Sequence, residues 1–394
     1  MKQILENLKK ENNYRFLKTI QYEGKYVLYQ GKKVLNLAGN DYLNIAKNEN
    51  LREEFFRQIQ KKDFFLSSSS SRSLSGNCSV YEKFENDLAQ KMNKTNPHSL
   101  KQMKSKDTKE VLHFNSGYQL NLSCIQALGT LANTLFIADK SIHASVIDGL
   151  RLSTSTFVRF RHNDMSHLES LLQQHYKKYE NIILISEALF SMDGDFTKLK
   201  KLIEFKKQYK NILLYIDEAH SVGCFDESGL GFARYLGLDQ EIDFLVFTFG
   251  KALASTGACI ITKKEFKEFF INKARAFIYS TALPPLNVAW THFIFEKLST
   301  FTQQRHNLQE KSQFLKNTLL QNGFEVLGQA HIISLMCKSN EKADELANRI
   351  LQCGIFAPAI KVPSVAKNTA RIRFSLHCDL DEEDLEKIVK SLLQ

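Results

Sequence analysis

Short apolar runs recur through the middle of the chain, and each is followed by a turn of small or polar residues and then by a helical pattern. Runs of this length and composition are typical of buried strands. Their regular alternation with helices predicts an α/β fold: a mainly parallel sheet with helices on both faces. The runs that carry this prediction are 111–114, 135–138, 182–185, 212–216 and 243–247.

The pattern changes after Pro284 and Pro285. One long helix is expected over about 286–321, followed by a strand, a helix, a strand and an acidic helix, which together indicate a smaller α+β domain. Near the start, residues 1–20 have the pattern of a basic amphipathic helix, and residues 24–37 alternate like a hairpin. A chain of 394 residues exceeds one typical domain. We therefore expect an N-terminal segment (1–45), a large domain (46–285) and a small domain (286–394).

Composition narrows the class of protein. No 18-residue apolar span occurs and the first residues lack the apolar core of a signal peptide, so a cytoplasmic protein without a membrane segment is expected. Seven cysteines, an odd number without CxxC spacing, favour neither a disulfide framework nor a zinc site, and no metal is expected.

The chain carries a formal charge of +10, from 53 basic and 43 acidic residues. A nucleic-acid-binding protein would account for this charge, but it predicts clustered arginines interleaved with aromatic residues, and the positive charges here are mostly scattered lysines. Lysines are dense in residues 1–20 and 93–110. An acidic protein partner or a phosphorylated ligand suits this charge better than nucleic acid does.

Lys251 follows the apolar run 243–247 and lies among small or apolar residues. A poorly solvated ammonium loses its proton more readily than a surface lysine, which suits an amine that forms a Schiff base. An isolated lysine in this position more often extends from a strand end into water.

A second strand end favours the Schiff-base interpretation of Lys251 over that of an ordinary solvated lysine. The run 212–216 leads into Asp217, with His220 close behind. Ligands of open α/β sheets bind beyond the carboxyl ends of the strands. Alone, Asp217 would be read as a turn or helix-cap residue. An acid and a lysine at two strand ends are together typical of a pyridoxal phosphate (PLP) site, where the acid holds the pyridinium proton. A strand, a small-residue turn and a helix start at 115–118 would suit the phosphate, although many such turns bind nothing.

In its motifs the sequence resembles a family, the α-oxoamine synthases, which are fold-type I PLP-dependent enzymes. The resemblance covers nearly the whole chain and rests on motifs that occur in the family's order. These motifs are Asn40–Leu43, Ser71–Gly76, Ser116–Tyr118 with Asn121, His143–Ser145, Phe190–Asp195, Asp217–His220, Thr248–Lys251, Ser280–Thr281 before Pro284–Pro285, and Ala370–Arg373.

The resemblance implies roles for individual residues. Lys251 would hold PLP and later move the proton at the α-carbon of the substrate. Asp217 would pair with the pyridinium nitrogen, and His143 would stack on the ring. The other implied cofactor contacts are Gly117, Tyr118, Glu187, Ser191, His220, Thr248 and Thr281.

For the substrates, the resemblance implies that Arg373 binds the amino-acid carboxylate, because a planar guanidinium matches a carboxylate, and that Asn40 assists. Arg15 and Ser364 would lie by the acyl donor. Arg371, by contrast, is expected to be a surface strand residue. Family members are homodimers with shared active sites, so Thr281 would reach the phosphate of the neighbouring subunit.

The implied reaction is a decarboxylative condensation of an amino acid with an acyl thioester. The motifs are closest to the branch that joins L-alanine to a pimeloyl thioester in biotin synthesis, with the acyl group carried by an acidic acyl carrier protein or by coenzyme A. Sister enzymes remain open: glycine C-acetyltransferase, 5-aminolevulinate synthase or an autoinducer synthase. A catalytically dead relative would usually lose its lysine, and Lys251 is present.

Overall fold

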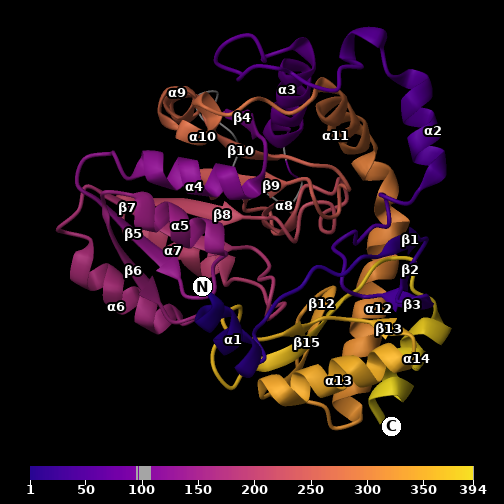
Figure 1. Cartoon of the computed structure of the whole chain (residues 1–394). Coiled ribbons are helices and arrows are strands. Elements are labelled where there is room, and N and C mark those ends of the chain that lie inside the picture. Colours follow the sequence, from indigo (N-terminus) through magenta and orange to yellow (C-terminus); the bar gives the residue numbers. More distant parts are fainter. Residues whose placement is uncertain (95, 97–107, 394) are drawn as a thin grey trace. The chain divides into compact units, whose positions relative to one another are not determined.

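The structure is a computed structural model that describes residues 1–94, 96 and 108–393 (Figure 1). By their internal contacts the residues form two compact units, which we call the sheet unit and the terminal unit. The sheet unit comprises Asn48–Phe190 and Phe196–Thr302, and the terminal unit comprises Met1–Lys47, Ser191–Asp195 and Gln303–Gln394.

The division after Thr302 differs from the boundary expected after residue 285. Helix α11 (Pro285–Lys297) belongs to the sheet unit because it packs against α3 (Ser79–Asn93). The two helices are joined by His292, whose Nε2 lies 2.8 Å from Oδ2 of Asp87. The expected long helix is therefore two helices, α11 and α12 (Thr302–Gln321), separated by a 3-10 turn over Leu298–Phe301.

The sheet unit is built on seven strands that all run in one direction except β10, which is antiparallel to both of its neighbours. The expectation of a mainly parallel sheet is confirmed, while β6 and β10 were not foreseen. In spatial order the strands are β4 (Lys109–Phe114), β10 (Ala258–Lys263), β9 (Phe244–Thr248), β8 (Ile212–Asp217), β7 (Asn181–Glu187), β5 (Thr134–Asp139) and β6 (Thr156–Phe160).

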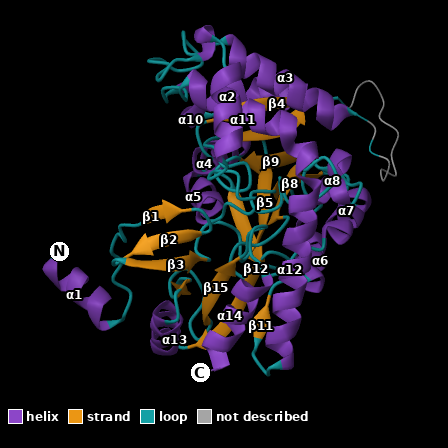
Figure 2. Cartoon of the chain, turned by 90° about the vertical axis from the view of Figure 1, so that its right-hand side faces the viewer, coloured by secondary structure: helices purple, strands orange, loops and turns teal. Residues whose placement is uncertain are grey.

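Helices cover both faces of this sheet, as expected (Figure 2). The strands are apolar at successive positions because both faces are buried. On one face, Phe136, Ile183 and Tyr215 join a single hydrophobic core with α4 and α5. Besides α3 and α11, the helices of this unit are α2 (Glu49–Gln58), α4 (Gly117–Leu128), α5 (Ala144–Leu152), α6 (Met165–His175), α7 (Leu199–Gln208), α8 (Phe232–Tyr235), α9 (Lys264–Lys273) and α10 (Arg275–Ile278), with short 3-10 turns at Lys61–Asp63 and Asp239–Glu241.

The terminal unit joins the two ends of the chain, so residues 1–45 do not stand apart from the C-terminal part. One sheet, in the order β1-β2-β3-β13, pairs strands from both ends, and the other has the order β11-β12-β15-β14. The elements are α1 (Lys2–Lys10), β1 (Gln21–Glu23), β2 (Tyr26–Tyr29), β3 (Lys32–Asn36), β11 (Val326–Leu327), β12 (Ile332–Lys338), α13 (Asn340–Gln352), β13 (Ile355–Phe356), β14 (Ala359–Ile360), β15 (Ala370–Ser375) and α14 (Glu382–Leu393), together with α12.

Two expectations about charged segments have different outcomes. The N-terminal helix is shorter than the expected 1–20, because α1 ends at Lys10. Most of the lysine-rich stretch 93–110 lies outside the described residues.

No helix in the described part of the chain is both long and apolar enough to cross a bilayer.

His113 is buried in the core of the sheet unit beside the turn that follows β9. Its ring lies 5.5 Å from that of Phe249, and neither ring nitrogen has a hydrogen-bond partner among the described residues. Gly257 (φ +107°) is required next to it, because a Cβ there would lie 2.9 Å from the imidazole. Burial, assisted by the positive charge of Arg72, lowers the pKa of His113 to about 3.

Acid should therefore destabilise the fold through His113. The folded protein keeps this ring neutral, whereas the unfolded chain protonates it below pH 6.5, so stability falls as the pH drops from about 6.5 towards 3. Between pH 7.5 and 5 the loss should be about 2 kcal/mol, and His113→Phe should remove it. Urea unfolding at the two pH values measures this difference. Tyr81→Phe, a neighbour without a group that titrates in this range, should shift both curves equally; a His113→Phe protein with unchanged pH dependence would refute the assignment.

Candidate active site

Two neighbouring parallel strands of the sheet unit end in polar residues. Asp217 is the last residue of β8 and Thr248 is the last of β9, so both lie at the carboxyl edge of the sheet. Lys251 follows in a tight turn, with its carbonyl accepting the N–H of Ala254, and its Nζ donates to Oγ1 of Thr248 at 3.2 Å. The structure thus brings the predicted strand-end acid and lysine to one edge of one sheet.

Asp217 is buried and accepts hydrogen bonds from Nδ2 of Asn121 (2.8 Å) and the N–H of Ala219 (2.9 Å). These two donors fix the orientation of the Asp217 side chain at the strand end. Glu187, the paired residue on β7, is also buried. Burial, reinforced by the charge of Asp217, raises the pKa of Glu187 well above its ordinary value. Of these two adjacent acids, Asp217 is the one placed to carry the negative charge.

His143 caps the N-terminus of α5, and its own N–H donates to Oε1 of Glu187 at 2.6 Å. Its ring meets that of Tyr118 edge to face, with centroids 6.1 Å apart. The residue remains exposed, yet the surrounding protein desolvates the ring and lowers its pKa, an effect that Lys251 supports and Asp217 opposes. His143 is therefore a neutral, accessible ring within the electrostatic reach of both.

The start of α4 approaches the end of β9 at Gly117. A Cβ there would lie 2.6 Å from Cγ2 of Thr248, so only glycine leaves the space between the two elements open. Ser116 caps the helix by accepting the N–H of Gln119. The N–H groups of Gly117 and Tyr118 lie in the first helical turn, where a helix stabilises an anion.

These groups fit PLP. The cofactor needs an acid for its pyridinium nitrogen, an amine for its aldehyde and donors for its phosphate. Asp217, Lys251 and the Gly117 turn with Thr248 supply all three within the sheet unit. Of the other implied contacts, His220 is buried just beyond β8, and Thr281 is exposed, with its carbonyl accepting Nδ2 of Asn115 at 2.6 Å.

The predicted carboxylate-binding residues lie together in the terminal unit. Arg373 is buried on β15, and its Nε donates to the carbonyl of Ser191 at 2.6 Å. Its Nη2 donates to Oδ1 of Asn40 at 3.2 Å. These contacts orient the guanidinium, and no other hydrogen bond from it is found among the described residues. Ser191, predicted as a cofactor contact, belongs to this unit.

The expectation that Arg371 lies at the surface is wrong. Arg371 is only 4% exposed and forms an ion pair with Asp193. Its Nη1 also donates to the carbonyl of Met192 at 3.2 Å. Strand alternation could not reveal this burial, because the partner segment is far away in sequence.

Arg15 and Ser364, the two residues predicted to lie by the acyl donor, are in contact although 349 positions separate them. Nη2 of Arg15 donates to Oγ of Ser364 at 3.1 Å. Lys361 lies near by and forms an ion pair with Asp344 at 2.7 Å. Burial lowers the pKa of Lys18, and Lys361 lowers it further while Asp344 opposes the shift. Lys18 and Lys361 therefore share one acid, Asp344, while Arg15 contacts Ser364, three residues beyond Lys361.

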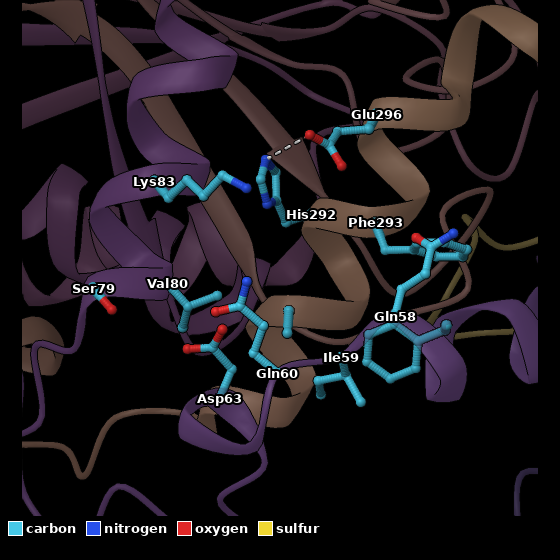
Figure 3. Close-up of a pocket in the computed structure, with 12 residues that line it drawn as sticks. Gln58, Ile59, Gln60, Asp63, Ser79, Val80, Lys83, His292, Phe293 and Glu296 are labelled. Atoms are coloured by element: carbon cyan, nitrogen blue, oxygen red, sulfur yellow. Dashed lines mark ion pairs between the residues drawn. The ribbon is translucent and has the colours of Figure 1, made fainter.

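The sheet unit also has a pocket of about 290 Å³ between α2, α3 and α11, away from the strand-end residues described above (Figure 3). At its edge His292 is 3.6 Å from Glu296 and also pairs with Asp87. One ligand atom from each of these three residues lies within 4.8 Å of the others, which is close enough for one cation. Sequence spacing could not show this cluster, and the expectation of no metal remains a prediction.

Comparisons with known proteins agree with this geometry. A sequence model of the aminotransferase class I and II family matches residues 32–392. A Glaesserella parasuis protein, provisionally named 8-amino-7-oxononanoate synthase, is 43% identical over 99% of both chains. The solved 8-amino-7-oxononanoate synthase from Francisella tularensis has a TM-score of 0.72 at 27% identity, covering 91% of this chain and 96% of that one. Serine palmitoyltransferase from S. paucimobilis has a TM-score of 0.86 at 22% identity, covering 99% and 94%.

The fold and the strand-end acid and lysine define a fold-type I, PLP-dependent transferase. The chain belongs to the aminotransferase class I and II family and, within it, to the α-oxoamine synthases. The resemblance found in the sequence motifs is thereby confirmed, as are the fold class and the dependence on PLP.

Proposed function

We propose that this enzyme joins L-alanine to a pimeloyl thioester and releases carbon dioxide, the activity of an 8-amino-7-oxononanoate synthase. The observation that carries the proposal is the placement of Asp217 and Lys251 at adjacent strand ends, with the neutral ring of His143 within their electrostatic reach. The name of the 43% identical relative supports the choice of substrates.

When bound, PLP supplies a ring that accepts the electron pair left at the α-carbon of the amino acid. Asp217 keeps the proton on the ring nitrogen, and Lys251 removes and returns the proton at the α-carbon. His143 would pack on the ring, and the N–H groups of Gly117 and Tyr118 would bind the phosphate together with Thr248. Glu187 holds the backbone of His143 in place.

In the terminal unit, Arg373 binds the carboxylate of alanine in this proposal, and Asn40 orients the guanidinium. The α-carbon then bonds to the acyl carbon, the thiolate leaves, and the alanine carboxylate departs as carbon dioxide. Positioning and electrostatics are the protein's contributions.

Product identification tests the proposed reaction. Purified enzyme is incubated with alanine, glycine or serine and a panel of acyl thioesters on coenzyme A or acyl carrier protein, and products are identified by mass spectrometry. The expected product combines alanine with the pimeloyl group. Turnover of glycine with an acetyl thioester would instead assign glycine C-acetyltransferase activity, and serine with a long acyl chain would assign the activity named for the serine palmitoyltransferase neighbour.

A homodimer is also part of the proposal. The sheet unit carries two highly exposed apolar side chains, Leu74 (82% exposed) and Tyr279 (71% exposed). Their segments lie side by side, because the carbonyl of Ser70 accepts the N–H of Ala282 at 2.9 Å. Thr281 is exposed in the second of these segments, so a second copy packed against them could receive its side chain. Light scattering should give twice the 45.3 kDa chain mass, and Leu74→Asp should lower it; a wild-type mass of one chain would contradict the dimer.

The basic group around Arg15, Lys18 and Lys361 is our candidate docking site for the acyl donor. An acyl carrier protein is acidic, and charge attraction would mainly raise its association rate. The contact between Arg15 and Ser364 supports a shared role for the two predicted donor residues.

Arg15→Ala should therefore raise the apparent KM for the thioester about two- to fivefold at low salt, the scale of an exposed ion pair. The KM for alanine should stay the same, and the effect should shrink as salt screens the charge. Lys33→Ala removes an exposed lysine of the hairpin and serves as the matched control. Equal thioester KM values for wild type and Arg15→Ala in both buffers would eliminate the docking role.

A further inference from the structure

A chain of hydrogen bonds runs beneath the strand ends of the sheet unit. The hydroxyl of Tyr215 lies 2.7 Å from Oδ1 of Asn121, whose Nδ2 lies 2.8 Å from Asp217 and 3.1 Å from Oγ of Ser145. That hydroxyl is in turn 2.7 Å from Nδ1 of His143. The three residues Tyr215, Asn121 and Ser145 are at most 2% exposed, so water does not compete for these bonds.

The direction of each bond follows from the donors and acceptors present. An ionised carboxylate only accepts, so Asn121 must turn its NH₂ group towards Asp217 and its oxygen towards Tyr215. Burial raises the pKa of Tyr215 well above its ordinary value, so the phenol keeps its proton and donates. The opposite amide orientation would place an oxygen against the carboxylate.

The same NH₂ group determines the proton of Ser145. Its second N–H points to Oγ of Ser145, which accepts it and leaves the serine O–H free to donate to His143. The backbone N–H of Ser145 donates to the same Nδ1 at 3.2 Å. Two donors directed at Nδ1 require a lone pair there, so the neutral ring carries its proton on Nε2.

We propose that Tyr215, Asn121 and Ser145 act as a positioning relay that holds the carboxylate of Asp217 and sets the Nε2–H tautomer of His143. None of the three has to touch cofactor or substrate for this role. The inference deepens the proposed function and rests on it in one respect, that Asp217 and His143 serve the bound PLP ring.

The relay keeps the positive charge of the site on groups other than His143. Asp217, Lys251 and Asp148 act on the charge of His143, the ring of Tyr118 packs edge to face against it, and Glu187 holds its backbone. The PLP ring must withdraw electrons when it is bound. Because the imidazole of His143 is neutral, Asp217 remains the charged partner of the pyridinium proton. If the His143 ring were protonated on Nδ1, it would direct a donor at the hydroxyl of Ser145. The sequence of donors and acceptors from Tyr215 to His143 would then be broken.

The test is nitrogen NMR of the histidine rings in the PLP-bound enzyme, with ¹⁵N-labelled histidine. The chain has 11 histidines, and loss of one set of signals in His143→Phe identifies His143. In wild type, Nδ1 should resonate as unprotonated and Nε2 as protonated. Ser145→Ala loses the hydroxyl donor but keeps the backbone N–H donor, so its nitrogen signals should move part of the way towards those of an averaged tautomer. Ser145→Thr, which keeps the hydroxyl, should retain the wild-type signals. Tyr215→Phe, which frees the amide of Asn121 to flip, should have a weaker effect in the same direction.

A wild-type spectrum with the proton on Nδ1, or Ser145→Ala and Tyr215→Phe spectra identical to wild type, would overturn the relay. Retained visible absorbance of bound PLP and an unchanged melting temperature establish that the variants are folded. The tautomer is measured without any acyl thioester, so failure of the relay and failure of the proposed substrates give separate results.

Discussion

Lys251→Ala should abolish turnover and the visible absorbance of covalently held PLP, near roughly 420 nm. Lys251 lies in the turn after β9, at the same sheet edge as Asp217, and its Nζ contacts Thr248. An alanine there can neither attach the cofactor nor carry the proton at the α-carbon. The absorbance spectrum, with borohydride reduction followed by peptide mapping, measures the attachment directly.

Lys109 provides the matched control for Lys251. It is a buried lysine of the same unit, and burial lowers its pKa to about 8. Its Nζ donates to the carbonyl of Ile242 rather than lying at the carboxyl edge of the sheet. Lys109→Met should therefore keep the absorbance. A borohydride-stable adduct that persists in Lys251→Ala would assign the attachment to a different amine.

Asp217→Asn should lower kcat by about 100- to 1000-fold, the scale on which removing an electrostatic partner in a dry site acts. The amide keeps the size of the side chain but not the charge that holds the proton on the ring nitrogen. PLP binding should weaken less, because the phosphate contacts at Gly117 and Thr248 remain. Single-turnover kinetics with alanine, alongside titration with PLP, separate the two effects.

Asp243→Asn is the control for this substitution. Asp243 is a buried acid of the same unit, but it directly precedes β9 and so lies away from the carboxyl ends of the strands. There it accepts the N–H of Leu214 and pairs with Lys206. The Asp243→Asn substitution should change the stability of the fold and leave kcat unchanged. If Asp217→Asn turned over at nearly the wild-type rate, another acid would hold the pyridinium proton.

The strands of the seven-stranded sheet that were predicted correctly share one property, burial on both faces, which gives continuous apolar runs such as 182–185 and 212–216. Strand β10 has a similar run but was missed, because periodicity does not separate a short buried strand from a buried helix and does not reveal which strand is antiparallel. The break at Leu298–Phe301 was missed for a related reason, since the apolar pattern continues through it.

In the active site, sequence reasoning reached the residues that follow strands, because strand ends converge at one edge of a sheet whatever the strand order. It did not reach the relay. Asn121 and Ser145 entered only as members of motifs, and Tyr215 looked like any core aromatic. Their roles depend on distances between α4, α5 and β8 that no spacing along the chain encodes. The burial of Arg371 was hidden in the same way.

The pairing of β3 with β13 has a consequence for how the protein is made. A ribosome that adds roughly 5 to 20 residues per second takes on the order of 15 to 60 s to travel from Asn36 to Phe356. For most of that interval the N-terminal hairpin is outside the ribosome, but the strand that completes its sheet has not been synthesised. The sheet unit, contiguous except for Ser191–Asp195, can fold first. Nascent chains should therefore carry an unpaired strand edge at their N-terminus until translation is almost finished, which is the state that chaperones bind.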